Sequence, residues 1–200
     1  MNGFRSGVWS LLSGLILLVG CVSIRVVEEN GSDGPIRYSL KSSPLYHEPV
    51  KHGTYTTWYP NGTKKSEVTY RNGKKYGVEI LWDAFGVKLR ETHYRNGMKS
   101  GKEIFWAAKN VKKKETGYKF NLRHGIETTF HDNGQPAKIE NYISGVKEGI
   151  ETGYDDAGRK VYQVTFSNGK KNGKEIFYDY SSGDKPVVTE IIWGDGKVVR

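Results

Sequence analysis

Apolar and polar residues alternate in short runs that recur every 24 residues from Gly53 onward. In the second copy, Val78, Ile80 and Trp82 are separated by single residues. Because successive side chains of a β-strand point to opposite faces, these three side chains would share one face. No window inside the repeats has helical periodicity. The pattern therefore predicts β-strands, with aromatic ladders supplying much of the buried surface.

Fixed positions within the unit carry the same kind of residue. A glycine opens each copy, at Gly53, Gly77, Gly101, Gly125, Gly149 and Gly173. The fifth residue after it is aromatic in every copy: Trp58, Trp82, Trp106, Phe130, Tyr154 and Tyr178. A constant period of this kind indicates stacked copies of one small unit that cannot bury its apolar surface alone.

Turn signals separate the predicted strands. In the first five copies, the ninth and twentieth residues after the opening glycine are glycine, except for Asn110 and Asn121. Asparagine tolerates left-handed backbone best after glycine, and Asn-Gly pairs are a strong hairpin signal. We therefore predict an all-β fold, a single-layer, twisted antiparallel meander of about six 24-residue β-hairpin repeats over residues 51–200. The sixth copy is irregular, and residues 186–193 are predicted to form its closing strand.

Charged residues also fall in rows. The chain has a net charge of +9. The position 22 residues after the opening glycine is basic in five copies, at Lys75, Lys99, Arg123, Lys147 and Lys171. The second position is glutamate from the second copy on, at Glu79, Glu103, Glu127, Glu151 and Glu175. In a stacked array such rows have a spacing of roughly 9–10 Å, two strand separations.

Two interpretations of these rows stay open. In the first, Lys75 precedes Glu79 by four residues across one tight turn, so the rows pair as exposed neighbours and keep the sheet soluble. Alternatively, the five basic residues bind an anionic lipid headgroup, an acidic envelope polymer or an acidic protein. The second interpretation makes the basic row, together with Trp58, Trp82 and Trp106, the candidate binding residues.

Catalytic chemistry has little support in the sequence. The five histidines are scattered along the chain, and the single cysteine leaves no metal-ligand spacing. No nucleophile elbow or phosphate-binding loop occurs. The glutamate row repeats one environment, whereas acid–base catalysis requires two carboxyl groups in different environments. We expect no catalytic residues, no metal site, no cofactor and no enzymatic activity.

The first twenty residues have the pattern of a signal peptide. Arg5 precedes an apolar segment, residues 8–19, that is too short to span a bilayer comfortably. The following residues, Leu18 to Cys21, are similar to the bacterial lipobox, whose cysteine is lipidated and becomes the new N-terminus. The resemblance implies lipidation of Cys21, export, and an envelope location, at the outer membrane if the host is Gram-negative. Residues 21–50 are polar and rich in turn formers, and are predicted to be a tether with a possible capping strand at residues 36–40.

The repeat resembles the bacterial variant of the MORN repeat. The resemblance rests on the glycine–aromatic spacing, on Asn61 with Gly62, and on Tyr70 followed by Gly73 and Gly77. It implies an interaction role without catalytic residues. We therefore predict a membrane-anchored lipoprotein whose repeat array is a binding or scaffolding surface for an envelope protein, an anionic polymer or lipid, and not for nucleic acid. The alternative is an antitoxin-like or immunity protein that occludes a toxin.

Overall fold

The computed structural model describes residues 22–107 and 111–199. Its regular elements in these ranges are all β-strands. The chain divides after Gly97 into two compact units, which we call the N-unit and the C-unit. The predicted signal peptide over residues 1–20 and the lipidation site at Cys21 lie outside the described residues.

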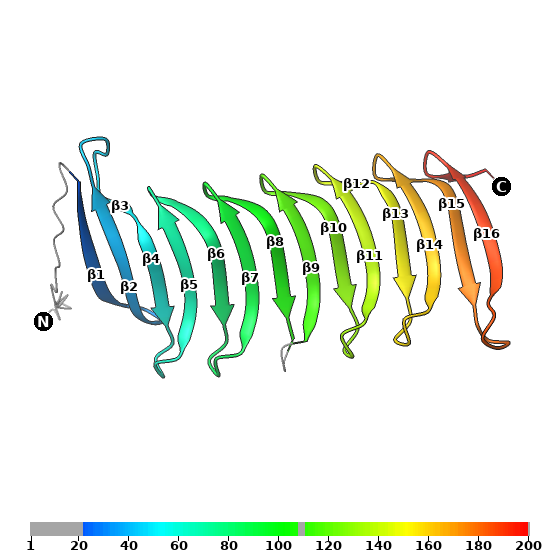
Figure 1. Cartoon of the computed structure of the whole chain (residues 1–200), viewed down its shortest axis with the longest axis horizontal. Coiled ribbons are helices and arrows are strands. Elements are labelled where there is room, and N and C mark those ends of the chain that lie inside the picture. The colour runs from blue at the N-terminus through cyan, green and yellow to red at the C-terminus, as the bar shows by residue number, and fades with distance from the viewer. Residues whose placement is uncertain (1–21, 108–110, 200) are drawn as a thin grey trace, which may run out of the picture. The chain divides into compact units, whose positions relative to one another are not determined.

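The N-unit is an antiparallel meander in which each strand pairs with the next along the chain, except that β2 pairs with both β3 and β4. Figure 1 shows these strands side by side in sequence order. The strands are β1 (Ser23–Gly31), β2 (Gly34–Ser42), β3 (Val50–Lys51), β4 (Gly53–Trp58), β5 (Lys64–Arg71), β6 (Lys74–Trp82) and β7 (Lys88–Arg95).

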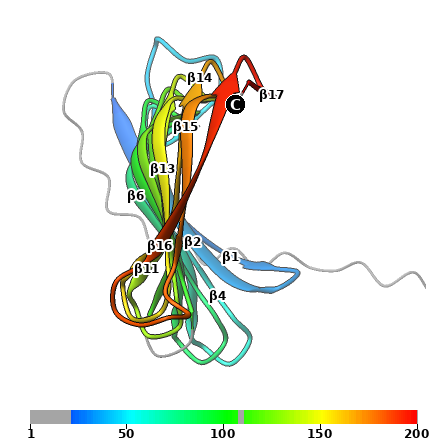
Figure 2. The ribbon, with the colours of Figure 1, turned by 90° about the vertical axis from the view of Figure 1, so that its right-hand side faces the viewer.

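The C-unit repeats the same topology. Its strand β11 pairs first with the short strand β12 and then with β13. Its strands are β8 (Met98–Trp106), β9 (Lys112–Lys119), β10 (Leu122–Phe130), β11 (Pro136–Ile143), β12 (Val146–Lys147), β13 (Gly149–Tyr154), β14 (Lys160–Ser167), β15 (Lys170–Asp179), β16 (Val187–Gly194) and β17 (Lys197–Val198). Within each unit the strands form a single twisted layer (Figure 2). The prediction of an all-β, antiparallel hairpin array is confirmed, and the closing strand is β16.

The hairpin turns follow the Asn-Gly signals. Asn72 and Asn168 both have φ of 50°, and the glycine after each is also left-handed, as a type I′ turn requires. Successive turns are joined by a repeated backbone hydrogen bond. The N–H of Gly97 donates to the carbonyl of Lys75, and that of Gly145 donates to the carbonyl of Arg123, both at 2.8 Å. These bonds link each copy to the one before it.

The segment predicted to be a tether with a possible capping strand forms a β-hairpin over residues 23–42, and the predicted capping strand lies in its second strand, β2. Strands β1 and β2 pair along their whole length, from Ser23 with Ser42 to Gly31 with Gly34. Strand β2 then pairs with β4 through Ile36 and Arg37. The polar run that suggested a linker contains the turn of this hairpin, and its flanking residues carry enough β-branched side chains to form strands.

The most buried positions also differ from the prediction, which placed the burial on aromatic ladders. They include the second-position glutamates, of which Glu103 and Glu127 are each 3% exposed. Val68, Thr92 and Thr116 are buried as well, each directly opposite a second-position glutamate on a neighbouring strand. We call the face that carries these residues the ladder face of each unit, and the opposite face, which carries Trp58, Trp82 and Trp106, the open face.

Candidate binding surfaces

A charged and aromatic cluster on the ladder face is best seen around Glu79. The Lys75 Nζ lies 2.5 Å from Glu79 Oε1 and 4.9 Å from the centre of the Tyr94 ring. The Tyr94 hydroxyl donates to Glu79 Oε2 at 3.3 Å, and the Arg90 guanidinium lies 3.5 Å from the same oxygen. The ammonium is therefore held between a buried carboxylate and a ring, a position that combines an ion pair with a cation–π contact.

The same cluster recurs in the C-unit. Every member of the basic row there contacts the glutamate four residues later: Lys99–Glu103 at 2.7 Å, Arg123–Glu127 at 3.8 Å, Lys147–Glu151 at 2.5 Å and Lys171–Glu175 at 2.5 Å. Each also lies over a ring, that of Tyr118, Tyr142, Phe166 or Trp193 respectively. The pairing that the sequence suggested is thus present, but it was wrongly placed across a turn, because Lys75 and Glu79 lie on the same strand β6. The carboxylates are also buried and not exposed. The pairing reduces the charge that the row offers to an external anion.

The first copy replaces the carboxylate with a ring. Tyr55 stands where the other copies have glutamate, and Lys51 occupies the position of the basic row. The Lys51 Nζ lies 3.9 Å from the centre of the Tyr55 ring and within 5.5 Å of the rings of Tyr38 and Tyr70. Burial is the main cause that lowers the pKa of Lys51. Because Tyr38 belongs to β2, this cluster fastens the β1–β2 hairpin to the repeats.

Three glutamates on neighbouring strands of the C-unit form an unbroken acidic line. Glu140 lies directly opposite Glu127 of β10, and the register places it opposite Glu151 of β13. Lys147 contacts both Glu140 and Glu151 at 2.5 Å, and Lys138 contacts Glu140 at 3.0 Å. Burial raises the pKa of Glu140, but hydrogen bonds from Lys147 and Lys138 outweigh it and bring the pKa from 4.5 down to about 2.

The predicted tryptophans lie half-buried on the open face. Lys64 lies over the Trp82 ring at 5.4 Å, and Lys112 lies over the Trp106 ring at 5.8 Å. These lysines also pair with glutamates three residues later, Glu67 and Glu115, both at 2.7 Å. The structure therefore separates the two sets of candidate residues, because the tryptophans and the basic row occupy opposite faces of the sheet.

Three of the five histidines, His52, His124 and His131, contact the backbone at or next to turns. His52 and His124 occupy the same repeat position, an equivalence that sequence reasoning missed, and each Nδ1 accepts a 3.4 Å hydrogen bond from a turn N–H, that of Asn72 or Ser144. His131 Nε2 lies 2.9 Å from the carbonyl oxygen of Tyr154 in the next copy. Among the described residues, no group of three or more histidine, cysteine, aspartate or glutamate side chains could hold a metal ion. That same part of the chain has no helix capable of crossing a membrane.

An aliphatic patch lies on the open face of the C-unit. Its members are exposed by 45–59% and come from the neighbouring strands β10 to β13: Leu122, Ile126, Ile143, Val146 and Ile150. The equivalent positions in other copies are mostly basic: Lys74, Lys102, Lys119, Lys170 and Lys174, with Arg71 and Arg95. We call these five residues the aliphatic patch. Comparing repeat positions one, eighteen and twenty-one would have found it in the sequence.

Phe120 lies in the turn next to the aliphatic patch and is backbone-strained. It has φ of 52° and is 60% exposed, at a position where Asn72, Asn96 and Asn168 occupy the equivalent turns. A bulky residue in the left-handed region costs about 1–2 kcal/mol. The exposed ring recovers little of this within the unit, and strain of this kind is typical of functional positions.

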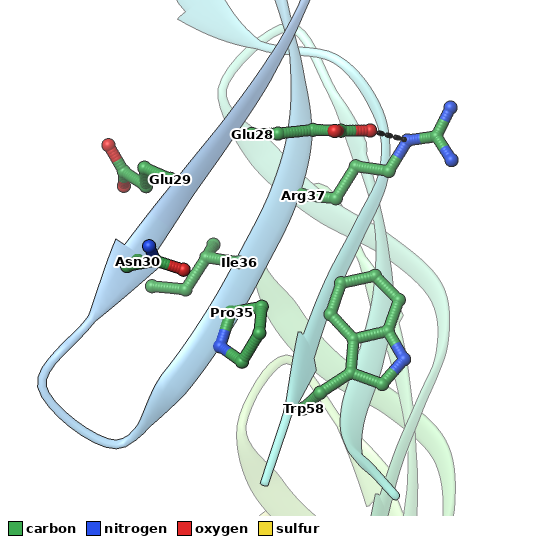
Figure 3. A pocket seen from close by; sticks show the side chains of 7 residues that line it. All are labelled: Glu28, Glu29, Asn30, Pro35, Ile36, Arg37 and Trp58. Atoms are coloured by element: carbon green, nitrogen blue, oxygen red, sulfur yellow. Dashed lines mark ion pairs between the residues drawn. The ribbon is translucent and has the colours of Figure 1, made fainter. Parts of the chain in front are cut away.

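A groove surrounds Trp58 in the N-unit. One hollow of about 400 Å³ is lined by Glu28, Glu29, Asn30, Pro35, Ile36, Arg37 and Trp58 (Figure 3). A second hollow of about 350 Å³ shares Arg37 and Trp58 with it and extends over β4 and β5 to Lys64 and Glu67. We call the two hollows together the Trp58 groove. Sequence reasoning named Trp58 but not its partners, because they come from the hairpin that was taken for a tether.

Comparison with known families finds a sequence profile described as MORN repeat variant at two places, residues 51–72 and 123–144. The two matches start at the same position of the 24-residue unit, two residues before Gly53 and Gly125. No curated protein matches the chain.

Proposed function

We propose that this protein is a non-catalytic binding and scaffolding lipoprotein of the cell envelope, anchored through Cys21, that docks a partner protein through the aliphatic patch of the C-unit. The observation that carries the proposal is the replacement of basic residues by Leu122, Ile126, Ile143, Val146 and Ile150 on neighbouring strands. Exposed, contiguous apolar surface is characteristic of interaction sites.

The basic row is better suited to stabilising the ladder face than to binding an external anion. Its side chains already contact buried glutamates and rings, so they stabilise the ladder face first. An acidic polymer or anionic lipid would have to compete with these internal partners, which favours a protein partner on the open face over an anionic one on the ladder face. Lys102 and Lys174, on strands that flank the aliphatic patch, pair with Glu115 and Glu190 but keep 63% and 59% of the side chain exposed. They therefore suit a partner with an acidic rim.

A variant that restores the repeat pattern tests the proposal. Ile126→Lys, Ile143→Arg and Val146→Lys together install residues that other copies already carry at these positions, so the fold should persist. After crosslinking in intact envelopes and identification by mass spectrometry, we expect the partner recovered with the unmodified protein to fall at least about tenfold. The loss follows from placing three charges in the apolar centre of the contact.

The matched control places three lysines at exposed apolar positions elsewhere: Ile24, Leu45 and Phe85. It should capture as much partner as the unmodified protein. Phe120→Asn removes only the strained ring and should weaken capture while raising stability. Equal capture by the repeat-restoring and control variants would refute docking at the aliphatic patch. A toxin recovered as the partner would favour the antitoxin-like alternative.

A further inference from the structure

The Trp58 groove lies between the non-repeat hairpin and the first repeat. The register pairs Glu28 with Arg37 across β1 and β2, and Arg37 with Thr56 across β2 and β4. Figure 3 shows the Trp58 ring on the same side as the Glu28 and Arg37 side chains, with Pro35 beside the ring. The groove therefore has one aromatic wall and a polar wall that meets it.

Four of the five charged side chains that line the Trp58 groove form two ion pairs with one another, and Glu29 is the fifth. Arg37 Nε lies 3.2 Å from Glu28 Oε1, and Lys64 Nζ lies 2.7 Å from Glu67 Oε2. Such pairs leave little net potential for attracting a strongly charged ligand. The Glu28 carboxylate still presents two oxygens, and the Arg37 guanidinium still presents its N–H groups. The exposed Asn30 adds a side-chain amide. Each of these ends can make two parallel hydrogen bonds.

We infer that the Trp58 groove binds a neutral saccharide. A pyranose ring has an apolar face of C–H groups, which packs on an indole, and an edge of neighbouring hydroxyls, which matches two-pronged polar groups. The first hollow, at about 400 Å³, lies within the range of small-ligand sites. The second hollow continues past Arg37 and Trp58, so the groove extends in the direction that a linear oligosaccharide would follow.

This site is independent of the proposed protein docking, because it lies in the N-unit and uses different residues. The two ideas therefore fail separately. The result of partner capture with the patch variant bears only on the aliphatic patch. The result of the saccharide titration bears only on the Trp58 groove.

The test is titration of the ¹⁵N-labelled full-length protein in detergent with a tetramer of N-acetylglucosamine and, separately, with maltotetraose. The indole N–H signal of each tryptophan is followed by NMR. We expect the Trp58 signal to move with at least one of the two saccharides, while the Trp82 and Trp106 signals stay in place. Trp58→Ala should weaken binding at least about tenfold, which is about 1.4 kcal/mol.

Trp82→Ala is the matched control, because Trp82 holds the same repeat position but does not line the Trp58 groove. It should leave the affinity within about twofold. Asn30→Ala is a second variant for the case in which Trp58→Ala disturbs the fold. It changes an exposed side chain, so the fold should persist, and it should also weaken saccharide binding. The inference is overturned if neither saccharide moves the Trp58 signal at tens of millimolar, or if only a glutamate-rich or lysine-rich tetrapeptide does.

Discussion

Lys147→Met is expected to lower the free energy of unfolding by about 3–5 kcal/mol, the range found when one partner of a buried ion pair is removed. Lys147 lies between two carboxylates, those of Glu140 and Glu151, at 2.5 Å from each. Methionine preserves most of the apolar stem but leaves Glu151 with the Tyr162 hydroxyl as its remaining close partner. Urea unfolding followed by circular dichroism measures the loss.

Lys171→Met is the matched control. Lys171 has the same repeat position and a similar ring contact, but it pairs with the single carboxylate of Glu175, which also accepts a 2.7 Å hydrogen bond from Trp193 Nε1. Its loss should be smaller, about 1–3 kcal/mol. In a Glu140→Thr background, which copies Thr92 and Thr116, Lys147→Met should cost no more than Lys171→Met. If Lys147→Met and Lys171→Met cost the same in the protein that keeps Glu140, the pairing of Lys147 with two carboxylates would not contribute the extra stability that we expect.

Gly153→Thr is expected to destabilise the C-unit by about 1–3 kcal/mol through overpacking. A Cβ at residue 153 would lie 2.1 Å from Tyr162 Cε1. The ring has little freedom to move, because the Tyr162 hydroxyl donates to Glu151 Oε1 at 2.7 Å. Thermal unfolding of the variant should show the loss.

A second substitution should reverse this effect. Gly153 and Tyr162 are directly opposite each other, as Thr129 and Lys138 are in the preceding copy. Gly153→Thr combined with Tyr162→Lys recreates that neighbouring pair. The double variant should be more stable than the sum of the two single changes predicts, by at least about 1 kcal/mol of coupling. Additive losses would show that residue 153 is glycine for some other reason.

Much of the fold follows from local signals. Asn72 and Asn168 occupy left-handed turn positions because their short polar side chains tolerate that backbone, and glycine follows each. Lys75 and Glu79 lie on one strand, β6, on either side of the left-handed Gly77, and their side chains pair there. These features depend on residues close in sequence, so the repeat pattern determines them.

Features that depend on which face is covered could not be read from alternation. In a single-layer sheet both faces contact solvent. The alternation of side chains shows that Glu79 and Ile80 point to opposite faces, but it does not show which of the two faces is covered. Long neighbouring side chains cover the glutamates, and this decides the burial. The Trp58 groove was hidden for another reason, because its polar wall belongs to a hairpin outside the repeat.

The separation of roles between the two faces unites these findings. On the ladder face, the basic row, buried glutamates and rings contact one another in every copy from the second on, and similar lysine–glutamate pairs lie beside Trp82 and Trp106 on the open face. On the open face, the aliphatic patch and the Trp58 groove depart from the repeat pattern, and a departure at exposed positions contributes nothing to that internal pairing. The two sites for which we propose binding therefore both lie on the open face of their units.

The carboxyl titration of Glu140, followed by ¹³C NMR, tests this division most directly. A pKa lowered in the folded state stabilises the protein above the unfolded value, and the gain is lost as pH falls through the folded value. With the pKa of Glu140 moving from 4.5 to about 2, the contribution is about 3 kcal/mol, fully present above pH 4.5 and lost toward pH 2. We predict a midpoint near pH 2. A midpoint near 4.5 would mean that the charged rows are free for outside partners, contrary to this account.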